Sequence, residues 1–200
     1  MPSSSRTSGR LGAGKLRIIG GSLRGSRLAV ADVMGLRPTS DRVRETLFNW
    51  LAPTISGARC LDLFAGTGAL GVEALSRGAA HVDFVERDAR LAQQLREDLV
   101  RLKQTGATVR NADALSVLAQ PPGQGYELVF LDPPFDANLW ESAIQQLESQ
   151  AWLVANALIY VESPALQELS LPGAWQVHRE SRAGAVRYAL YRRSAKLGGS

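Results

Sequence analysis

A glycine-rich segment in the first half of the chain has the residue types and spacing of a nucleotide-binding loop. Gly66, Gly68 and Gly71 complete a G-x-G-x-x-G pattern, and Glu86 follows Gly68 by eighteen residues. Glycines let the backbone turn tightly and approach a ligand closely. An acid at the position of Glu86 accepts hydrogen bonds from ribose hydroxyls. Both features suit any adenosine cofactor, so the pattern leaves NAD and S-adenosylmethionine as alternatives.

Asp62 favours S-adenosylmethionine. It lies near the end of the predicted buried strand 59–64, where a charge is costly unless it has a partner. The cationic amino-acid end of S-adenosylmethionine is such a partner, whereas a pyrophosphate would be repelled. The other interpretation is that the Asp62 carboxylate staples the loop.

The segment Asp132-Pro133-Pro134-Phe135 follows the predicted strand 127–131. Prolines lack an N–H group and fix φ, so the turn is rigid. The Asp132 carboxylate and the Pro133 carbonyl are two acceptors for the N–H bonds of an exocyclic amino group, and Phe135 offers a ring on which a base can stack. Such a turn at the carboxyl end of a strand predicts transfer of a group to the amino nitrogen of a base.

Strands and helices alternate from residue 59 onwards. The apolar periodicity predicts strands over 59–64, 81–86, 108–112, 127–131 and 158–161, and helices over 69–77, 89–103, 113–119 and 139–150. The end of the chain differs, because 176–179 and 186–191 flank a turn that contains Gly184 and predict an antiparallel hairpin. We therefore expect an α/β fold with a mostly parallel sheet and an antiparallel C-terminal hairpin.

The start of the chain is basic. Residues 1–44 hold nine Lys or Arg and two Asp, a net charge of +7, whereas residues 45–200 carry a net charge of −3. Residues 1–15 have the composition of a flexible basic tail. Segments 16–19 and 23–30 predict a β-hairpin, and 41–51 a helix. We divide the chain into the tail (1–15), an N-terminal extension (16–52) and a catalytic domain (53–200), and expect the extension to bind nucleic acid.

Several classes of protein are excluded by composition. The single Cys60 cannot form a disulfide within the chain, and with only two histidines we expect no metal site. The longest charge-free apolar stretch, 151–161, is too short to span a bilayer. No apolar run follows the Ser- and Arg-rich start, so we expect neither a secretory signal nor a membrane partner.

With these motifs in view, the chain resembles the bacterial 16S ribosomal RNA guanine-N2 methyltransferases of the RsmD type. The resemblance is carried by 16–21 with 24–25, by Arg37-Pro38-Thr39-Ser40-Asp41, by 62–68 and by Asp132-Pro133-Pro134-Phe135. It implies a Rossmann-like class I methyltransferase fold and methyl transfer to the exocyclic amino group of one guanine, position 966 in the usual bacterial numbering. It also implies 16S rRNA in a small ribosomal subunit or its assembly intermediate as substrate. We expect a cytoplasmic monomer.

The resemblance and the residue patterns together give the expected site. The cofactor S-adenosyl-L-methionine, which leaves as S-adenosyl-L-homocysteine, is expected to contact Asp62, Phe64, Ala65, Gly66, Gly68, Glu86, Asp113 and Ala114. Asp113 has a second interpretation as a helix N-cap. The catalytic set is Asp132, Pro133, Pro134 and Phe135. The residues expected to bind RNA phosphates are Arg17, Arg24, Arg27, Arg37, Arg42 and Arg44. Arg42 and Arg44 could also be solvated helix charges, and one of them could instead reach the carboxylate of the cofactor.

Three rival functions share part of this pattern. The same chemistry could act on another RNA or on DNA adenine or cytosine, but the chain has no separate target-recognition domain. A nicotinamide oxidoreductase would use the same glycine loop, but no hydride-transfer site is visible. A non-catalytic RNA-binding assembly factor would not need the intact Asp132 turn.

Overall fold

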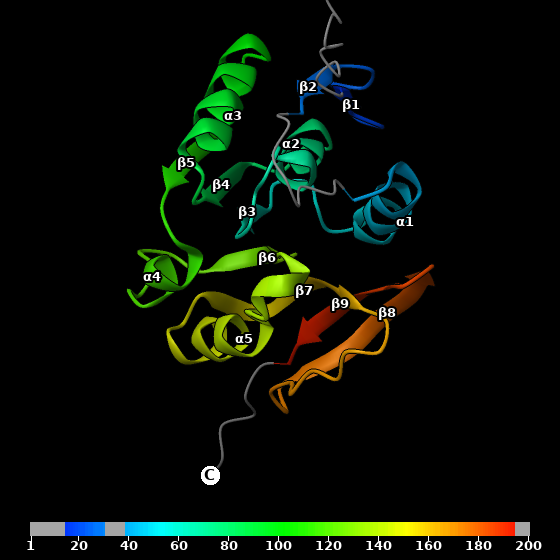
Figure 1. Ribbon diagram of the computed structural model, residues 1–200, viewed down its shortest axis with the longest axis vertical. Coiled ribbons are helices and arrows are strands. Elements are labelled where there is room, and N and C mark those ends of the chain that lie inside the picture. Colours follow the sequence, from blue (N-terminus) through cyan, green and yellow to red (C-terminus); the bar gives the residue numbers. More distant parts are fainter. Residues whose placement is uncertain (1–14, 31–38, 195–200) are drawn as a thin grey trace, which may run out of the picture.

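The computed structural model of the chain describes residues 15–30 and 39–194 (Figure 1). Its main element is a sheet of seven strands. In spatial order they are β5 (Ala107–Asn111), β4 (His81–Glu86), β3 (Arg59–Asp62), β6 (Tyr126–Leu131), β7 (Leu153–Pro164), β9 (Val186–Arg193) and β8 (Trp175–Ala183). Neighbours from β5 to β7 are parallel, and β9 pairs antiparallel with both β7 and β8. The predicted mostly parallel sheet with a C-terminal hairpin is confirmed.

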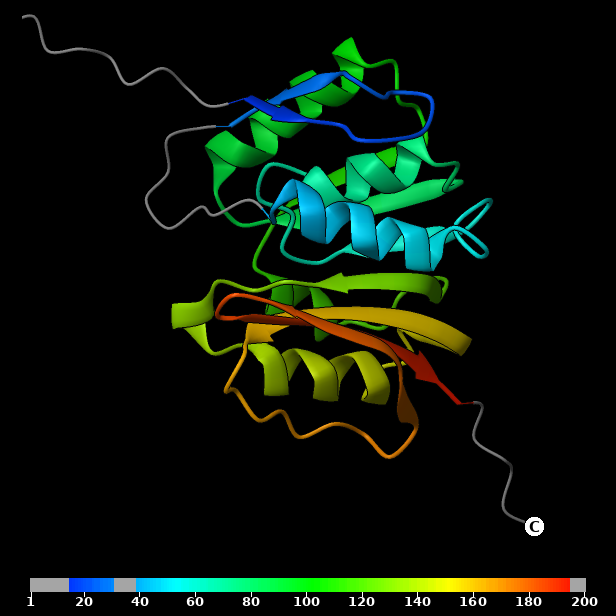
Figure 2. The same cartoon turned by 90° about the vertical axis from the view of Figure 1, so that its right-hand side faces the viewer.

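Helices cover both faces of the sheet (Figures 1 and 2). One layer contains α1 (Asp41–Leu51), α2 (Ala69–Ser76) and α3 (Ala89–Arg101), and the other contains α4 (Ala114–Leu118) and α5 (Trp140–Ser149). Successive side chains of a strand point to opposite faces. The sheet therefore has two hydrophobic cores. The first lies between the sheet and the layer of α1, α2 and α3, and contains Cys60. The second lies between the sheet and the layer of α4 and α5, and contains Leu61. Burial on both faces explains why these strands read as continuous apolar runs.

The N-terminal hairpin consists of β1 (Lys15–Arg17) and β2 (Arg27–Ala29), which pair antiparallel and lie beside α3 in Figure 2. Both strands are shorter than predicted. The residues between them form a turn, in which Gly21 and Gly25 have φ of +75° and +86°. The hairpin shares the first core through Leu16, Ile18 and Leu28.

Strand β7 is longer than the predicted 158–161. It begins five residues earlier because it contains an irregularity that sequence periodicity does not show. Tyr126 pairs with Leu153 while Leu128 pairs with Leu158, and Asn156 between them has φ of +64°. Pairing with β9 extends the strand to Pro164. The long β7 carries Glu162 to the edge of the sheet at which the parallel strands end.

Helix α1 begins where the sequence predicts it. The Ser40 hydroxyl accepts a hydrogen bond from the Val43 N–H, which caps the helix. Thr39, immediately before the cap, is buried. Because Ser40 is fixed by the cap, the preceding Thr39 is held at the N-terminal end of α1.

Among the described residues, no helix is long and apolar enough to cross a membrane.

Candidate active site

The glycine loop lies at the carboxyl end of β3, as predicted, and two carboxylates hold it. Asp62 Oδ2 accepts a hydrogen bond of 2.9 Å from the Gly71 N–H. Glu86 Oε2 accepts one of 2.8 Å from Gly66, and its Oε1 accepts one of 2.7 Å from Asp88. The structure thus shows the second interpretation of Asp62, in which its carboxylate holds the loop through Gly71. Glu86 holds the start of the loop in the same way, through Gly66.

Backbone conformation explains Gly68, and close packing explains Gly71. Gly68 has φ of +78° and starts α2. A Cβ atom at Gly71 would overlap the Phe84 ring. Phe64 and Ala65 belong to the same turn, because the Ala65 N–H donates to the Val85 carbonyl at 2.9 Å and the Gly68 N–H to the Ala65 carbonyl at 2.7 Å. The turn is thus rigid before any ligand arrives.

Asp113 caps α4. Its Oδ1 accepts hydrogen bonds from the Ser116 N–H at 2.9 Å and the Ser116 hydroxyl at 3.0 Å. Of the two interpretations of Asp113, the structure therefore shows the helix cap. The residue is exposed and Ala114 after it is buried. Asp113 follows β5 at the same edge of the sheet as the glycine loop, where a bound adenine could still reach it.

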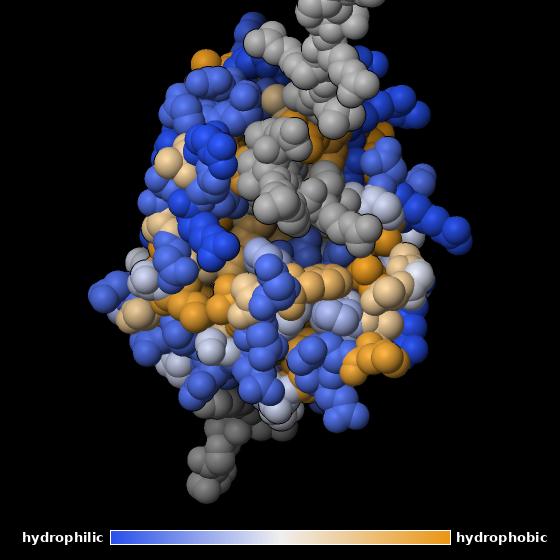
Figure 3. Space-filling view, in the orientation of Figure 1, coloured by the Kyte–Doolittle hydropathy of each residue, from blue (hydrophilic) through white to orange (hydrophobic). Residues whose placement is uncertain are grey.

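The predicted catalytic turn follows β6 at this edge. Pro133 is buried, Pro134 is exposed, and Phe135 is 41% exposed. The Phe135 ring lies against Trp140 with a centroid distance of 5.7 Å, and the indole N–H of Trp140 donates to the Glu162 carbonyl at 2.8 Å. The Trp140 indole thus supports one side of the partly exposed Phe135 ring. On the side of the molecule shown in Figure 3, apolar residues gather in a band across the middle.

Half-buried Asp132 contacts three buried polar residues, and we call the group the Asp132 cluster: Asp132, Thr39, Glu162 and Tyr160. The Thr39 hydroxyl lies 3.2 Å from Asp132 Oδ2 and 3.3 Å from Glu162 Oε2. The Tyr160 hydroxyl donates to the same Glu162 oxygen at 2.8 Å. Burial raises the pKa of Asp132 well above its usual range, and the neighbouring Glu162 raises it further. The pKa of Glu162 is also raised, chiefly by burial.

Asp62 is the last residue of β3, and Asp132 follows the neighbouring β6. Burial raises the pKa of Asp62 to about 7, the Gly71 hydrogen bond lowers it and the charge of Glu86 raises it. The charge of Asp62 in turn raises the pKa of Asp132. These acids come from three different strand ends, so the edge concentrates negative charge that a cationic ligand would neutralise. No group of three or more His, Cys, Asp or Glu within 15–30 and 39–194 has the arrangement of a metal site.

Sequence reasoning missed Thr39 and Glu162 as site residues. Glu162 carried the same signal as Asp62, a charge near the end of a buried apolar strand, but the predicted strand ended before it. Thr39 gave no such signal, because its partners Asp132 and Glu162 lie 93 and 123 residues further along the chain.

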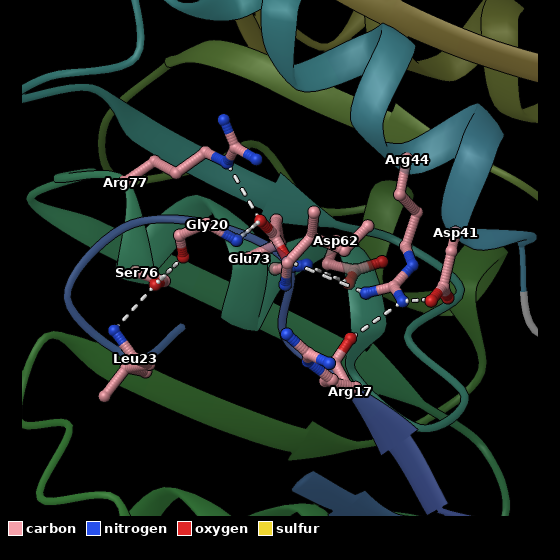
Figure 4. Close-up of polar contacts among 11 residues, drawn as sticks. Arg17, Gly20, Leu23, Asp41, Arg44, Asp62, Glu73, Ser76 and Arg77 are labelled. Atoms are coloured by element: carbon pink, nitrogen blue, oxygen red, sulfur yellow. Dashed lines mark hydrogen bonds and ion pairs between the residues drawn. The ribbon is translucent and has the colours of Figure 1, made fainter. Parts of the chain in front are cut away.

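The N-terminal extension is joined to α2 by a second buried group, the Glu73 cluster, drawn in Figure 4. Its members are Glu73, Arg44, Arg77 and the backbone of Ile19 and Gly20. Glu73 accepts hydrogen bonds of 2.8 Å from each of the two backbone N–H groups and one of 2.9 Å from Arg77, and lies 3.6 Å from Arg44 Nη1. Three hydrogen-bond donors and the charge of Arg44, from three segments of the chain, therefore converge on one carboxylate.

The structure corrects the prediction for Arg44. We expected it to bind RNA or to be a solvated helix charge, but its side chain is 0% exposed. It pairs with Asp41 at 2.7 Å and donates to the Arg17 carbonyl at 2.9 Å. Both of these hydrogen bonds are made by Nη2, and Nη1 lies within ion-pair distance of Glu73. Arg44 therefore positions the extension and is not available to a phosphate.

The other predicted arginines lie differently. Arg17, Arg24, Arg27 and Arg42 are exposed, and Arg37 lies outside the described residues. Arg17 and Arg24 line one hollow of about 220 Å³ together with Ile19, Asp41 and Glu45. These two arginines are therefore on the same side of the extension.

The glycine pair after β1 permits close docking of the hairpin. The Ser22 N–H donates to the Ser76 carbonyl at 2.7 Å. A Cβ atom at Gly21 would overlap that carbonyl, and one at Gly20 would overlap the Arg77 guanidinium. A larger residue at position 21 would therefore move the hairpin away from α2, whereas one at position 20 would displace the Arg77 side chain.

Comparison with known proteins identifies the family. The family model described as conserved hypothetical protein 95 matches residues 16–192. The chain belongs to this family. It is 54% identical over 186 residues to the Ribosomal RNA small subunit methyltransferase D of Escherichia coli (strain K12), which covers 92% of this chain and 93% of that protein. Its identity to the protein of the same name from Haemophilus influenzae is 50%, over 89% of this chain and 94% of the relative.

Solved structures agree with this assignment. The methyltransferase yhhF from Escherichia coli superposes with a TM-score of 0.85 at 50% identity, covering 92% of this chain and all of that one. A methyltransferase solved in complex with SAH has a TM-score of 0.63 at 14% identity over 83% of this chain, which shows the shared fold alone. The chain is thus a methyltransferase with the class I fold, and its donor is S-adenosylmethionine. The acids at the strand ends fit that cationic cofactor.

Proposed function

We propose that the protein transfers a methyl group from S-adenosylmethionine to the exocyclic N2 of a guanine in small-subunit ribosomal RNA. The observation that carries the proposal is the Asp132 turn, which places a carboxylate, a proline carbonyl and an exposed ring beside the glycine loop. The family members named as small-subunit rRNA methyltransferases support the substrate class. We further propose position 966 of 16S rRNA as the target, in an assembling subunit, and a cytoplasmic monomer as the active form.

The cofactor would be held by the loop residues named above. Gly66 and Gly68 bring backbone close to it, Asp62 and Glu86 supply carboxylates at the strand ends, and Asp113 lies near the end of β5. When bound, S-adenosylmethionine supplies an electrophilic methyl group on a positively charged sulfur. The buried acids of this edge stabilise that charge, and the charge favours their ionised forms.

Asp132 and the Pro133 carbonyl would accept the two N–H bonds of the target amino group. The lone pair of that nitrogen is conjugated with the ring, so the free amino group is a poor nucleophile. Two fixed acceptors keep electron density on nitrogen, and their attraction grows as the nitrogen becomes positive in the transition state. Phe135 would stack on the flipped base, and such stacking contributes about 1–3 kcal/mol per base.

The exposed arginines of the extension would contact the RNA backbone. Arg17, Arg24, Arg27 and Arg42 are exposed, and each phosphate contact adds salt-sensitive affinity that does not depend on sequence. The extension (16–52) would then position the substrate, and the domain from residue 53 would carry out the chemistry. The Glu73 cluster keeps the two parts in register.

Substitution Asp132→Ala tests the proposal. We expect methyl transfer to small subunits that lack the modification to fall by at least about 100-fold, as when a transition-state acceptor or donor is removed elsewhere. Binding of S-adenosylmethionine, measured by calorimetry, should remain close to that of the wild type. Asp136→Ala, an exposed acid four residues later, is the matched control and should keep its activity. Substantial turnover by Asp132→Ala would contradict the mechanism, and methylation of DNA in place of rRNA would contradict the substrate.

A further inference from the structure

The Asp132 cluster places one buried hydroxyl between the buried carboxyl group of Glu162 and the half-buried carboxyl group of Asp132. Thr39 Oγ1 is 3.2 Å from Asp132 Oδ2 and 3.3 Å from Glu162 Oε2. A threonine hydroxyl has a single hydrogen and can donate it to one of them only. The other contact is a hydrogen bond only if the carboxyl group itself carries a proton and donates it to Oγ1. When both contacts are hydrogen bonds at the same time, the group holds one proton more than two carboxylates and a hydroxyl provide.

Two proton arrangements satisfy every contact. In the first, Asp132 carries the proton and donates to Thr39, and Thr39 donates to Glu162. In the second, Glu162 carries the proton and donates to Thr39, and Thr39 donates to Asp132. The Tyr160 hydroxyl donates to Glu162 in both. The arrangements differ only in the position of two protons, and the hydroxyl is the group that reverses its direction.

The surroundings favour a single shared proton. Thr39 is 7% exposed and Glu162 8% exposed, and two buried charges this close would repel each other. The groups that face the pair are Asp62 beside Asp132, Tyr160 beside Glu162, and Tyr188, which is opposite Glu162 on β9. None of these is cationic, and no lysine or arginine of the described residues forms an ion pair with Asp132 or Glu162 within 4.0 Å.

We propose that Asp132 and Glu162 hold one proton between them through the Thr39 hydroxyl, and that Thr39 and Glu162 are positioning residues which free Asp132 to accept the target amino group. This inference rests on the proposed function. When an amino N–H reaches Asp132, the proton on Asp132 moves to Thr39 while the Thr39 proton moves to Glu162. Asp132 thereby becomes a carboxylate without placing a second negative charge in the buried site.

Methyl transfer to the amino group releases one proton, which the Asp132 cluster takes up. The amino nitrogen forms its bond to the methyl carbon, and the carbon–sulfur bond breaks with its electron pair left on sulfur. The nitrogen then carries a positive charge and loses one N–H proton to the Asp132 carboxylate, keeping the bond's electron pair. Asp132 and Glu162 are both protonated at that point. One proton passes to water as the product leaves, which restores the shared state.

The test is a double-mutant cycle read as the pH dependence of single-turnover methyl transfer. In Thr39→Val the arrangement with Asp132 ionised loses both hydrogen bonds of the Thr39 hydroxyl. Tyr160 still donates to Glu162, so Glu162 ionises first. Asp132 must then lose its proton beside the negative charge of Glu162. The acid limb of the profile should move up by about one pH unit, which is tenfold in rate on that limb. Thr39→Ser restores the hydroxyl and should return the limb to its wild-type position.

Glu162→Gln distinguishes the shared proton from simple repulsion. In the wild-type background it should move the acid limb little, because Glu162 is already neutral whenever Asp132 is charged. In the Thr39→Val background it should lower the limb by about one unit. Equal shifts in both backgrounds would overturn the proposal. The matched controls are Thr46→Val, whose hydroxyl donates to the Arg42 carbonyl in the same helix, and Glu97→Gln on α3, and both should leave the profile unchanged.

A second measurement needs neither RNA nor cofactor. Carboxyl protonation of the free protein is titrated by NMR with isotope-labelled Asp and Glu. The last proton of the pair should leave at a lower pH in Glu162→Gln and in Asp132→Asn than in the wild type, because the neighbouring charge is gone. Unchanged midpoints would refute the shared proton even if the enzyme is active. If the midpoints shift but the wild type methylates no RNA, the proposed function fails while the shared proton stands.

Discussion

The two buried carboxylate clusters of this protein are built in opposite ways. In the Glu73 cluster one carboxylate receives two backbone N–H groups and the side chain of Arg77, with Arg44 3.6 Å away. In the Asp132 cluster two carboxyl groups share one threonine hydroxyl, with one tyrosine added. The first matches its acid with cations and donors, and the second concentrates acids. The first joins two parts of the chain, and the second stands where a base would react.

The comparison shows what distinguishes a structural acid from a reactive one. A buried carboxylate whose oxygens already accept hydrogen bonds from the protein, as those of Glu73 do, gains little from binding a further donor. A buried carboxyl whose pKa is raised, as for Asp132 and Asp62, gains stability when a positive ligand arrives. The site is thus completed by a cationic cofactor and an amino group, whereas the junction at Glu73 is complete already.

The largest effect should come from breaking the structural cluster. Glu73→Ala removes one of the two acidic partners of buried Arg44 and leaves two backbone N–H groups without their acceptor. We expect a loss of about 3–5 kcal/mol in the free energy of unfolding, measured by urea denaturation. The matched control Glu97→Ala removes an exposed acid from α3 and should change stability by less than about 0.5 kcal/mol. A loss for Glu73→Ala no larger than the control would contradict the role given to the cluster.

A smaller effect should separate Asp62 from Glu73. The pKa of Asp62 is raised to about 7, so the folded protein keeps this proton to a higher pH than the unfolded chain does. Stability from this group is therefore present below pH 4 and is lost as the pH rises to 7. Asp62→Asn keeps an acceptor oxygen for Gly71 and lacks the titration.

The measurement is urea denaturation at pH 5 and pH 8. Relative to the wild type, Asp62→Asn should gain on the order of 2 kcal/mol between these pH values. The control Glu97→Gln should follow the wild type at both. Parallel curves for Asp62→Asn and the wild type would mean that Asp62 is as well compensated as Glu73.

The smallest effect concerns the surface of the extension. Arg24→Gln should reduce the slope of log affinity against log salt for RNA binding by about one if Arg24 contacts one phosphate. The control Arg90→Gln removes an exposed arginine of α3 that pairs with Asp88 and should leave the slope unchanged. Filter binding over a range of salt concentrations measures both. Equal slopes for the two variants would remove Arg24 from the RNA-binding surface.

Local patterns in the sequence predict most of the fold. The alternating elements from β3 to α5, the cap of α1 and the C-terminal hairpin all follow from periodicity and turn residues within a few positions. The glycine loop and the Asp132 turn are local motifs too, and the topology brings them to one edge of the sheet. The length of β7 could not be predicted, because its irregularity and its pairing with β9 depend on other strands.

The fine structure of the site depends on contacts between distant segments. Arg44 is like any exposed helix arginine in sequence, and two of its partners, the Arg17 carbonyl and Glu73, lie in other segments of the chain. The meeting of Thr39 with Asp132 and Glu162 likewise requires the extension to be docked. Local spacing carries no information on such contacts, so they emerge only in the folded chain.

The most direct test of the central claim is mass mapping of methylated guanines in small-subunit RNA from cells that lack this protein. The account predicts that one N2-methylguanine, at position 966, is absent, that the wild-type gene restores it, and that Asp132→Ala does not. A small-subunit RNA whose guanine methylation is unchanged by loss of the protein would contradict the account, as would full restoration by Asp132→Ala.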